Sequence, residues 1–200
     1  YVATEDQEII DDVNKNGGRA ILTSNQHKTG TDRIYEALKK IGKPDIELIM
    51  NLQGDEPLMN IEDIRNLHEK MVKTKSEMGT LASKIKDESF FQKENIVKVL
   101  TKKSLTNSEF TEAINFMRKT GDLRDNVYHH LGIYCYKIET LKSFVSLNQS
   151  KNEISNKLEQ LRALDNNIRI KVSLAKESPI GVDTEEDFVA IKKIMEYKLK

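Results

Sequence analysis

The chain has 200 residues with 32 basic and 32 acidic side chains, so its formal net charge is zero. This length suffices for one sizeable hydrophobic core and predicts a single domain over residues 1–200. Acids and bases are interspersed, which argues against a nucleic-acid partner, and no apolar run approaches the ~20 residues of a membrane-spanning helix. The one cysteine, Cys135, excludes an intramolecular disulfide and fits a reducing compartment, so we expect a cytoplasmic protein without membrane insertion.

Strand and helix signals alternate through the first half of the chain. Residues 1–4 have the character of the end of a strand. Helices are predicted where apolar residues recur at helical spacing after a capping residue, at 6–17, at 31–41 and from Asn60 onward. Short apolar runs bounded by Gly, Pro or Asp predict strands at 20–22 and 46–52. This β-α-β-α order predicts an α/β fold with a mostly parallel sheet and helices on both faces.

The second half is less regular. Strands are predicted at 78–85, 96–100, 130–136 and 168–174, and helices from about 139, at 153–164 and at 185–198. Residues 102–128 are polar and weakly periodic, and no element is assigned to them. We expect the insertion 86–128 to form a small edge lobe over the ligand end of the sheet, or a dimer contact.

Two acidic motifs follow predicted strands. Asn51-Leu52-Gln53-Gly54-Asp55-Glu56-Pro57 comes directly after the run at 46–50, and Gly181-Val182-Asp183-Thr184 lies downstream of the strand at 168–174. Open α/β sheets bind ligands at the carboxyl ends of their strands. Two aspartates placed there can share one Mg²⁺ with a polyphosphate, and phosphoryl transfer depends on such positioning and charge neutralisation. The pair therefore indicates a nucleotidyl-transfer site.

Each aspartate also has an ordinary structural explanation. Gly54-Asp55-Glu56-Pro57 is good turn chemistry. Asp183 precedes Thr184, which forms a capping-box pattern with Asp187. Only their joint appearance at strand ends favours a metal site.

Further candidates are weaker taken singly. His27-Lys28-Thr29-Gly30-Thr31-Asp32-Arg33 enters a helix, and Gly30 with the helix N-terminus suits a polar or anionic partner or an ordinary capped turn. His129 and His130 are predicted to face opposite sides of their strand. Arg118 suits a substrate carboxylate, although solvated arginines are common.

Taken in order, the motifs resemble the family of 3-deoxy-manno-octulosonate cytidylyltransferases. The matching segments cover essentially the whole chain: Val2-Ala3-Thr4, His27-x-Thr29-Gly30-Thr31-Asp32-Arg33, Asn51-x-Gln53-Gly54-Asp55-Glu56-Pro57, His130-Leu131-Gly132-Ile133-Tyr134, Leu158-Glu159-Gln160-Leu161-Arg162 and Gly181-Val182-Asp183-Thr184. The resemblance implies a nucleotide-diphosphosugar-transferase-like (Rossmann-like) fold and a homodimer. It also implies transfer of CMP from CTP to 3-deoxy-D-manno-octulosonate (Kdo), with Mg²⁺ and release of pyrophosphate, for lipopolysaccharide synthesis.

The same resemblance assigns roles by position. The metal ligands are Asp55 and Asp183, which with Arg118 form the catalytic set. The acidic-sugar pocket is lined by Gln53, Arg118, His130, Tyr134, Glu159 and Gln160. The nucleotide lies along Thr29, Gly30, Thr31 and Arg33.

The chain departs from the family pattern in three ways. It begins with Tyr1, so we expect a fragment that lacks the family's first strand and triphosphate loop, with little turnover on its own. Phe116-Met117-Arg118 lacks the proline that follows the family's Phe-Ser-Arg, and Thr29 stands where serine is usual. The alternatives are a cytidylyltransferase for another acidic sugar, 8-amino-Kdo or a nonulosonic acid, and a catalytically inactive nucleotide- or sugar-binding module.

Overall fold

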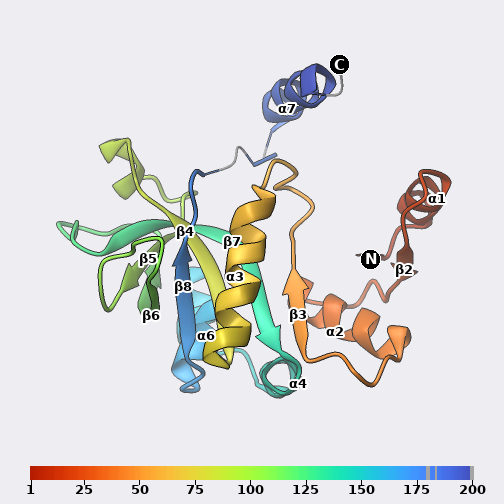
Figure 1. The fold of residues 1–200 in the computed structure, drawn as a ribbon, viewed down its shortest axis with the longest axis horizontal. Coiled ribbons are helices and arrows are strands. Elements are labelled where there is room, and N and C mark those ends of the chain that lie inside the picture. The colour runs from red at the N-terminus through yellow and green to blue at the C-terminus, as the bar shows by residue number, and fades with distance from the viewer. Residues whose placement is uncertain (179–180, 183, 199–200) are drawn as a thin grey trace.

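The computed structural model describes residues 1–178, 181, 182 and 184–198, and its centre is a six-stranded sheet (Figure 1). The strand order is β3-β7-β4-β8-β6-β5, and β5 also pairs with β7. The strands are β3 (Leu48–Asn51), β4 (Met78–Ser83), β5 (Lys98–Thr101), β6 (Phe110–Met117), β7 (Val127–Lys137) and β8 (Ile170–Leu174).

The α/β class is confirmed, but the expectation of mostly parallel pairing is wrong for this sheet. Only β4 and β8 pair in parallel, and the other pairings of the sheet are antiparallel. The reason is the course of β7, which follows β6 and enters between β3 and β4 from the opposite direction. Strands that share a direction are thereby separated, as is common in mixed sheets.

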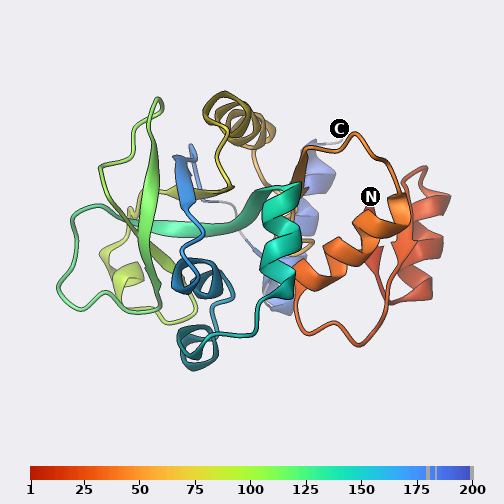
Figure 2. The same ribbon diagram turned by 90° about the horizontal axis from the view of Figure 1, so that it is seen from below.

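A second, two-stranded sheet holds the N-terminal residues. β1 (Val2–Thr4) pairs in parallel with β2 (Ala20–Leu22), and α1 (Gln7–Lys15) connects them. The predicted helix start is confirmed, because the Asp6 carboxylate accepts a hydrogen bond from the Glu8 N–H at 2.8 Å. In Figures 1 and 2 this unit lies beyond α2 (Gly30–Ile41), away from the six-stranded sheet.

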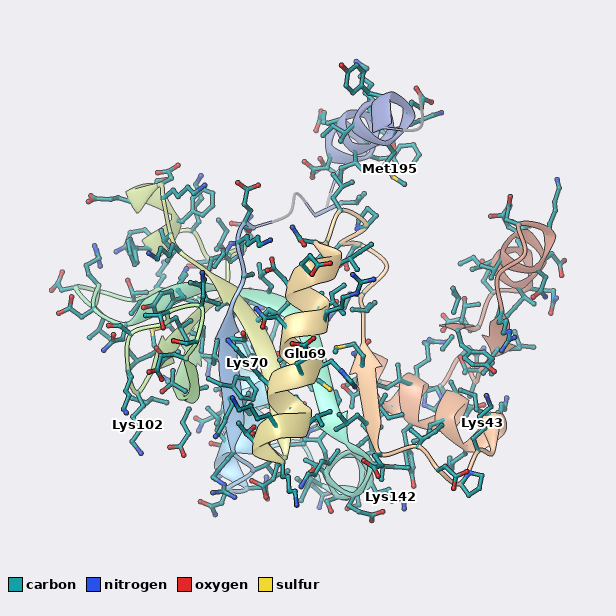
Figure 3. All side chains as sticks on the ribbon, viewed as in Figure 1. Lys43, Glu69, Lys70, Lys102, Lys142 and Met195 are labelled. Atoms are coloured by element: carbon teal, nitrogen blue, oxygen red, sulfur yellow. The ribbon has the colours of Figure 1, made fainter. Side chains whose placement is uncertain are left out.

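Helices cover both faces of the main sheet, as predicted. α3 (Ile61–Thr74) packs on one face, while α2, α4 (Ile138–Ser146) and α6 (Gln160–Asp165) pack on the other, so that α3 and α6 lie on opposite sides in Figure 2. Lys70 of α3, labelled in Figure 3, donates hydrogen bonds to the carbonyls of Asn107 and Glu109 and to the Ser173 hydroxyl, at 2.8–2.9 Å. α3 is therefore held against the sheet by polar contacts as well as by its apolar face.

Alternation along β7 divides its side chains between two hydrophobic cores. Leu131, Ile133 and Cys135 belong to the cluster under α3, whereas Tyr134 and Tyr136 belong to the cluster on the other face. The buried position of Cys135 agrees with its apolar sequence context.

Several boundaries differ from prediction. The helix expected at 153–164 is two helices, α5 (Lys151–Asn156) and α6, because Lys157 adopts a left-handed conformation with φ of 53° between them. The segment 86–128 contains a 3-10 turn (Glu88–Phe91) together with β5 and β6, which extend the main sheet beyond β8. The predicted C-terminal helix is present as α7 (Glu185–Lys198). Within the described ranges, every helix is too short or too polar to cross a membrane.

The packing of α3 leads to a prediction about the stability of the fold. Leu67 is fully buried, whereas Ile61 of the same helix is 63% exposed. We expect Leu67→Ala to lower the free energy of unfolding by about 2–5 kcal/mol, because it removes buried methyl groups and leaves a cavity. Urea unfolding at 25 °C measures this, and Ile61→Ala is the control, with a change within about 0.5 kcal/mol. Equal effects of the two substitutions would contradict the packing described.

Candidate active site

The motif after β3 folds back onto the backbone of β7. The Gln53 side-chain amide donates to the Gly132 carbonyl at 3.1 Å, and the Glu56 carboxylate faces the Gly132 N–H at 3.4 Å. A Cβ at position 132 would lie 3.1 Å from the Gln53 amide nitrogen, which is tighter than most real contacts. Glycine at 132 therefore allows the motif to approach the strand.

The two acidic motifs meet. The Val182 N–H donates a 2.8 Å hydrogen bond to the Asp55 carbonyl, although the two residues lie on different connections of the chain. Asp183, the predicted second metal ligand, lies outside the described residues. The described backbone thus brings the segment Gly181-Val182 directly against Asp55.

A pocket of about 260 Å³ opens at this junction. Its walls come from the Asp55 motif, the loop before β5, the first half of β7 and the segment after β8: Asp55, Glu56, Asn95, Ile96, Val97, His129, His130, Leu131, Gly132, Ser178 and Gly181. Residues that are far apart in the sequence therefore line one cavity.

His130 is a neutral hydrogen-bonding group at this pocket. It is buried, and burial with the neighbouring His129 lowers its pKa to about 3. Its Nε2 lies 3.0 Å from the Thr80 hydroxyl, which itself donates to the Ile133 carbonyl at 2.7 Å. The Thr80 proton is thus engaged, so His130 Nε2–H is the donor and Nδ1 remains an acceptor.

The two neighbouring histidines face opposite ways, as predicted. The His130 ring packs edge-on against Phe116, while the His129 ring lies near Phe90. His129 Nδ1 is 2.8 Å from the Ser178 hydroxyl, and burial lowers the pKa of His129 to about 4. His129 therefore joins β7 to the segment that leads toward the second acidic motif.

Arg118 does not point its donors into the pocket. Its guanidinium donates to the carbonyls of Glu94, Asn156 and Lys157 at 2.9–3.0 Å. These bonds link the end of β6 to the loop before β5 and to the end of α5. Arg118 in this structure holds the loop that contributes Asn95 to the pocket wall.

Sequence reasoning missed Lys98, which is fully buried in β5. Its ammonium donates to the carbonyls of Lys93, Ile96 and Arg118, and burial lowers its pKa. The signal available was a lysine inside an otherwise apolar run, Ile96–Leu100. Thr80 was also missed, since a threonine in a strand carries no distinguishing pattern.

A second group of predicted residues gathers where α2 begins. Thr29 is the N-cap, two residues earlier than predicted, and its hydroxyl accepts from the Asp32 N–H at 3.2 Å. Thr31 donates to the Glu159 carboxylate at 2.9 Å, across 128 residues of sequence. Gly30 is exposed at the first turn, with open space where a Cβ would lie. The predicted nucleotide-binding helix start is thus in contact with a predicted sugar-binding residue.

The remaining predicted residues fall into two environments. Tyr134 is buried in a row of rings between His130 and Tyr136, and burial raises its pKa. Gln160 is buried at the start of α6. Arg33 instead bonds the Thr23 hydroxyl at 2.7 Å and pairs with Glu5, so its guanidinium joins α2 to the two-stranded sheet.

An α/β sheet that carries an acidic motif at a strand end, together with an exposed helix start, is typical of the nucleotidyltransferase class. Residues 1–170 match the cytidylyltransferase family. The chain belongs to this family, and within it to the 3-deoxy-manno-octulosonate cytidylyltransferases.

Two curated relatives and one solved structure document this membership. The 3-deoxy-manno-octulosonate cytidylyltransferase of Thermodesulfovibrio yellowstonii is 41% identical over 98% of this chain and 80% of that protein. The protein of the same name from Bartonella tribocorum is 39% identical over 97% of this chain and 80% of its own length. A solved CMP:2-keto-3-deoxy-manno-octonic acid synthetase complexed with CTP superposes with a TM-score of 0.86 at 30% identity, over 98% of this chain and 80% of that one.

The two buried histidines predict an acid-sensitive fold. Because the pKa values of His129 and His130 lie below the ~6.5 of an unfolded histidine, the unfolded chain binds more protons between about pH 6.5 and 4. Their contribution to stability is therefore complete above pH 6.5 and is lost as the pH falls. Each imidazole adds a slope of up to about 1.4 kcal/mol per pH unit.

In His130→Gln we expect the free energy of unfolding to fall less steeply as the pH decreases, by up to about 1.4 kcal/mol per pH unit. Urea unfolding at pH 7, 6 and 5 measures it. The exposed Asn25 provides the control, and Asn25→Gln, which changes no titratable group, should leave the pH dependence as in the parent. An unchanged dependence in His130→Gln would show that folding does not lower the pKa of His130.

Proposed function

We propose that this chain transfers CMP from CTP to the anomeric hydroxyl of Kdo, giving CMP-Kdo and pyrophosphate for lipopolysaccharide biosynthesis. The observation that carries the proposal is the hydrogen bond from Val182 to Asp55, which joins the two acidic motifs at the pocket beside His130. The names of the relatives support the substrate pair.

In this proposal Asp55 and Asp183 hold Mg²⁺. Carboxylate oxygens are the hard ligands that Mg²⁺ prefers, and the backbone next to Asp183 docks on Asp55 itself. The two carboxylates proposed as ligands therefore fit Mg²⁺ by their chemistry. When bound, Mg²⁺ supplies positive charge to the triphosphate and to the leaving pyrophosphate.

The chain's own residues bind and orient the two substrates. The start of α2, with Thr29, Gly30 and Thr31, receives the polar nucleotide through its free N–H groups. His130 Nδ1 accepts a sugar hydroxyl, because the imidazole is neutral and its other nitrogen is bonded to Thr80.

The other predicted residues complete the sugar side. Gln53, Tyr134, Glu159 and Gln160 surround the acidic sugar. We assign Arg118 and Arg33 to positioning, since both guanidinium groups bond protein partners. The anomeric oxygen then attacks the α-phosphorus and its proton passes to solvent. The bond from that phosphorus to the oxygen that bridges the α- and β-phosphates breaks, and pyrophosphate leaves with that oxygen.

Two further features belong to the proposal. The resemblance to the family supports a homodimer, and the single buried thiol of Cys135 supports a reducing, cytoplasmic setting. Another acidic sugar is the second candidate substrate, because sugars that differ by one group are told apart by individual pocket contacts.

We expect Asp55→Asn and Asp183→Asn to lower Kdo-dependent release of pyrophosphate by about 10³-fold or more, since each removes one carboxylate of the metal site. The assay contains CTP, Mg²⁺ and Kdo with the full-length protein. Asp122→Asn removes an exposed carboxylate elsewhere and should keep parental activity.

Three outcomes decide between the candidates. Release that persists in one aspartate variant removes that residue from the metal site. Release with 8-amino-Kdo or a nonulosonic acid but not with Kdo identifies a different sugar. CTP binding without release from any of these sugars contradicts the enzymatic proposal and favours a binding module.

A further inference from the structure

Arg162 lies in a buried cluster behind the proposed sugar site. Its Nε and Nη2 donate to the two oxygens of the Glu153 carboxylate at 2.8 and 2.5 Å. Both side chains are only 4% exposed. The guanidinium carbon is also 4.7 Å from the centre of the Phe144 ring. Contacts from α4 and α5 therefore leave this arginine of α6 little freedom to move.

The same guanidinium reaches a second carboxylate. Arg162 Nη2 is 3.7 Å from Glu159 Oε1, so one nitrogen faces both Glu153 and Glu159. Glu159 Oε2 accepts from Thr31, whereas Oε1 is buried and has no hydrogen-bond partner. A buried carboxylate oxygen in this state is an acceptor available to a ligand hydroxyl.

The charge of Glu159 depends on this arginine. Burial raises the pKa of Glu159, and the hydroxyls of Thr29 and Thr31 and the charge of Arg162 oppose that rise. Asp32 at the start of α2 adds to it. From β7, the phenol groups of Tyr134 and Tyr136 also face Glu159. Arg162 is thus the cation that favours the ionised form from within the fold.

We propose that Arg162 is a positioning residue: held by Glu153 and Phe144, it keeps Glu159 charged and leaves Glu159 Oε1 open to accept a hydroxyl of the bound ligand. Only the identity of that ligand, an acidic sugar, rests on the proposed function. Arg162 acts through Glu159, and Thr31 extends the connection to the start of α2.

Two substitutions with opposite expected effects on the pKa of Glu159 distinguish this role from a purely structural ion pair. Arg162→Met removes the cation, so we expect the pKa of Glu159 to rise by about one unit. Glu153→Gln removes the competing carboxylate and frees Arg162 for Glu159, so the pKa of Glu159 should fall. A pair that only stabilises the fold would lower stability in both variants without shifting Glu159 in opposite directions.

The pKa of Glu159 is measured directly by ¹³C NMR titration of the glutamate carboxyl carbons, with Glu159→Gln to assign the signal. Arg169→Met, which breaks an exposed ion pair with Glu77, is the matched control and should leave Glu159 unchanged. If Arg162→Met does not fold, the double variant Glu153→Gln/Arg162→Met removes both buried charges and should still raise the pKa.

The pH profile of kcat/KM for the sugar gives the second readout. Its acidic limb should move up by about one pH unit in Arg162→Met and down in Glu153→Gln. Shifts of the Glu159 signal in the same direction in both variants, or in neither, would overturn the positioning role. Opposite NMR shifts in a full-length protein that turns over no acidic sugar would retain that role and refute the proposed activity.

Discussion

The course of β7 through the sheet determines where the site forms. β7 pairs with β3, β4 and β5, so its backbone is held from both sides. Opposite the Thr80–Leu81 bond, the register passes from Tyr134 to Leu131, which leaves Gly132 and Ile133 as extra residues on β7. Because successive side chains of a strand point to opposite faces, two extra residues leave the side chains on either side of the bulge on their original faces of the sheet. One extra residue would have moved the side chains before the bulge to the other face. His130 therefore stays on the face of Tyr134, and the bulge presents the Gly132 backbone to the Asp55 motif.

Groups that are distant in sequence then hold this arrangement. The Thr80 hydroxyl donates to the Ile133 carbonyl within the bulge and accepts from His130. Lys98 donates to the Lys93 and Ile96 carbonyls of the loop before β5 and to the Arg118 carbonyl after β6. The Arg118 side chain donates to the Glu94 carbonyl of the same loop. Both cations donate to backbone carbonyls, Lys98 in partly buried surroundings and Arg118 at the surface. These bonds hold the loop that contributes Asn95, Ile96 and Val97 to the pocket wall.

The sequence predicted local features of this arrangement well and long-range ones poorly. Asp6 and Asn60 were correct as helix caps, and the alternation of His129 and His130 was correct, because these depend on neighbouring residues. The insertion of β7 between β3 and β4 depends on pairings across the whole chain, so element order alone suggested a parallel sheet. Arg118 stays a predicted substrate ligand. Its hydrogen bonds to the carbonyls of Asn156 and Lys157 span 38 and 39 residues, and no local pattern in the sequence indicates them. The left-handed Lys157 that separates α5 from α6 had no glycine or proline to signal it.

Charge at the site explains why the proposed chemistry calls for a metal ion. The described side chains around the pocket and the start of α2 include Asp55, Glu56 and Glu159, while CTP and an acidic sugar are both anions. Two like unit charges 4 Å apart repel by about 4 kcal/mol at an effective dielectric constant of 20. The adjacent arginines are already engaged: Arg33 pairs with Glu5, and Arg162 with Glu153. Mg²⁺ held by Asp55 and Asp183, as proposed, would supply positive charge that offsets this repulsion. The chain as a whole has a net charge of zero. This is compatible with anionic substrates, because in the proposal only the metal site needs to attract them.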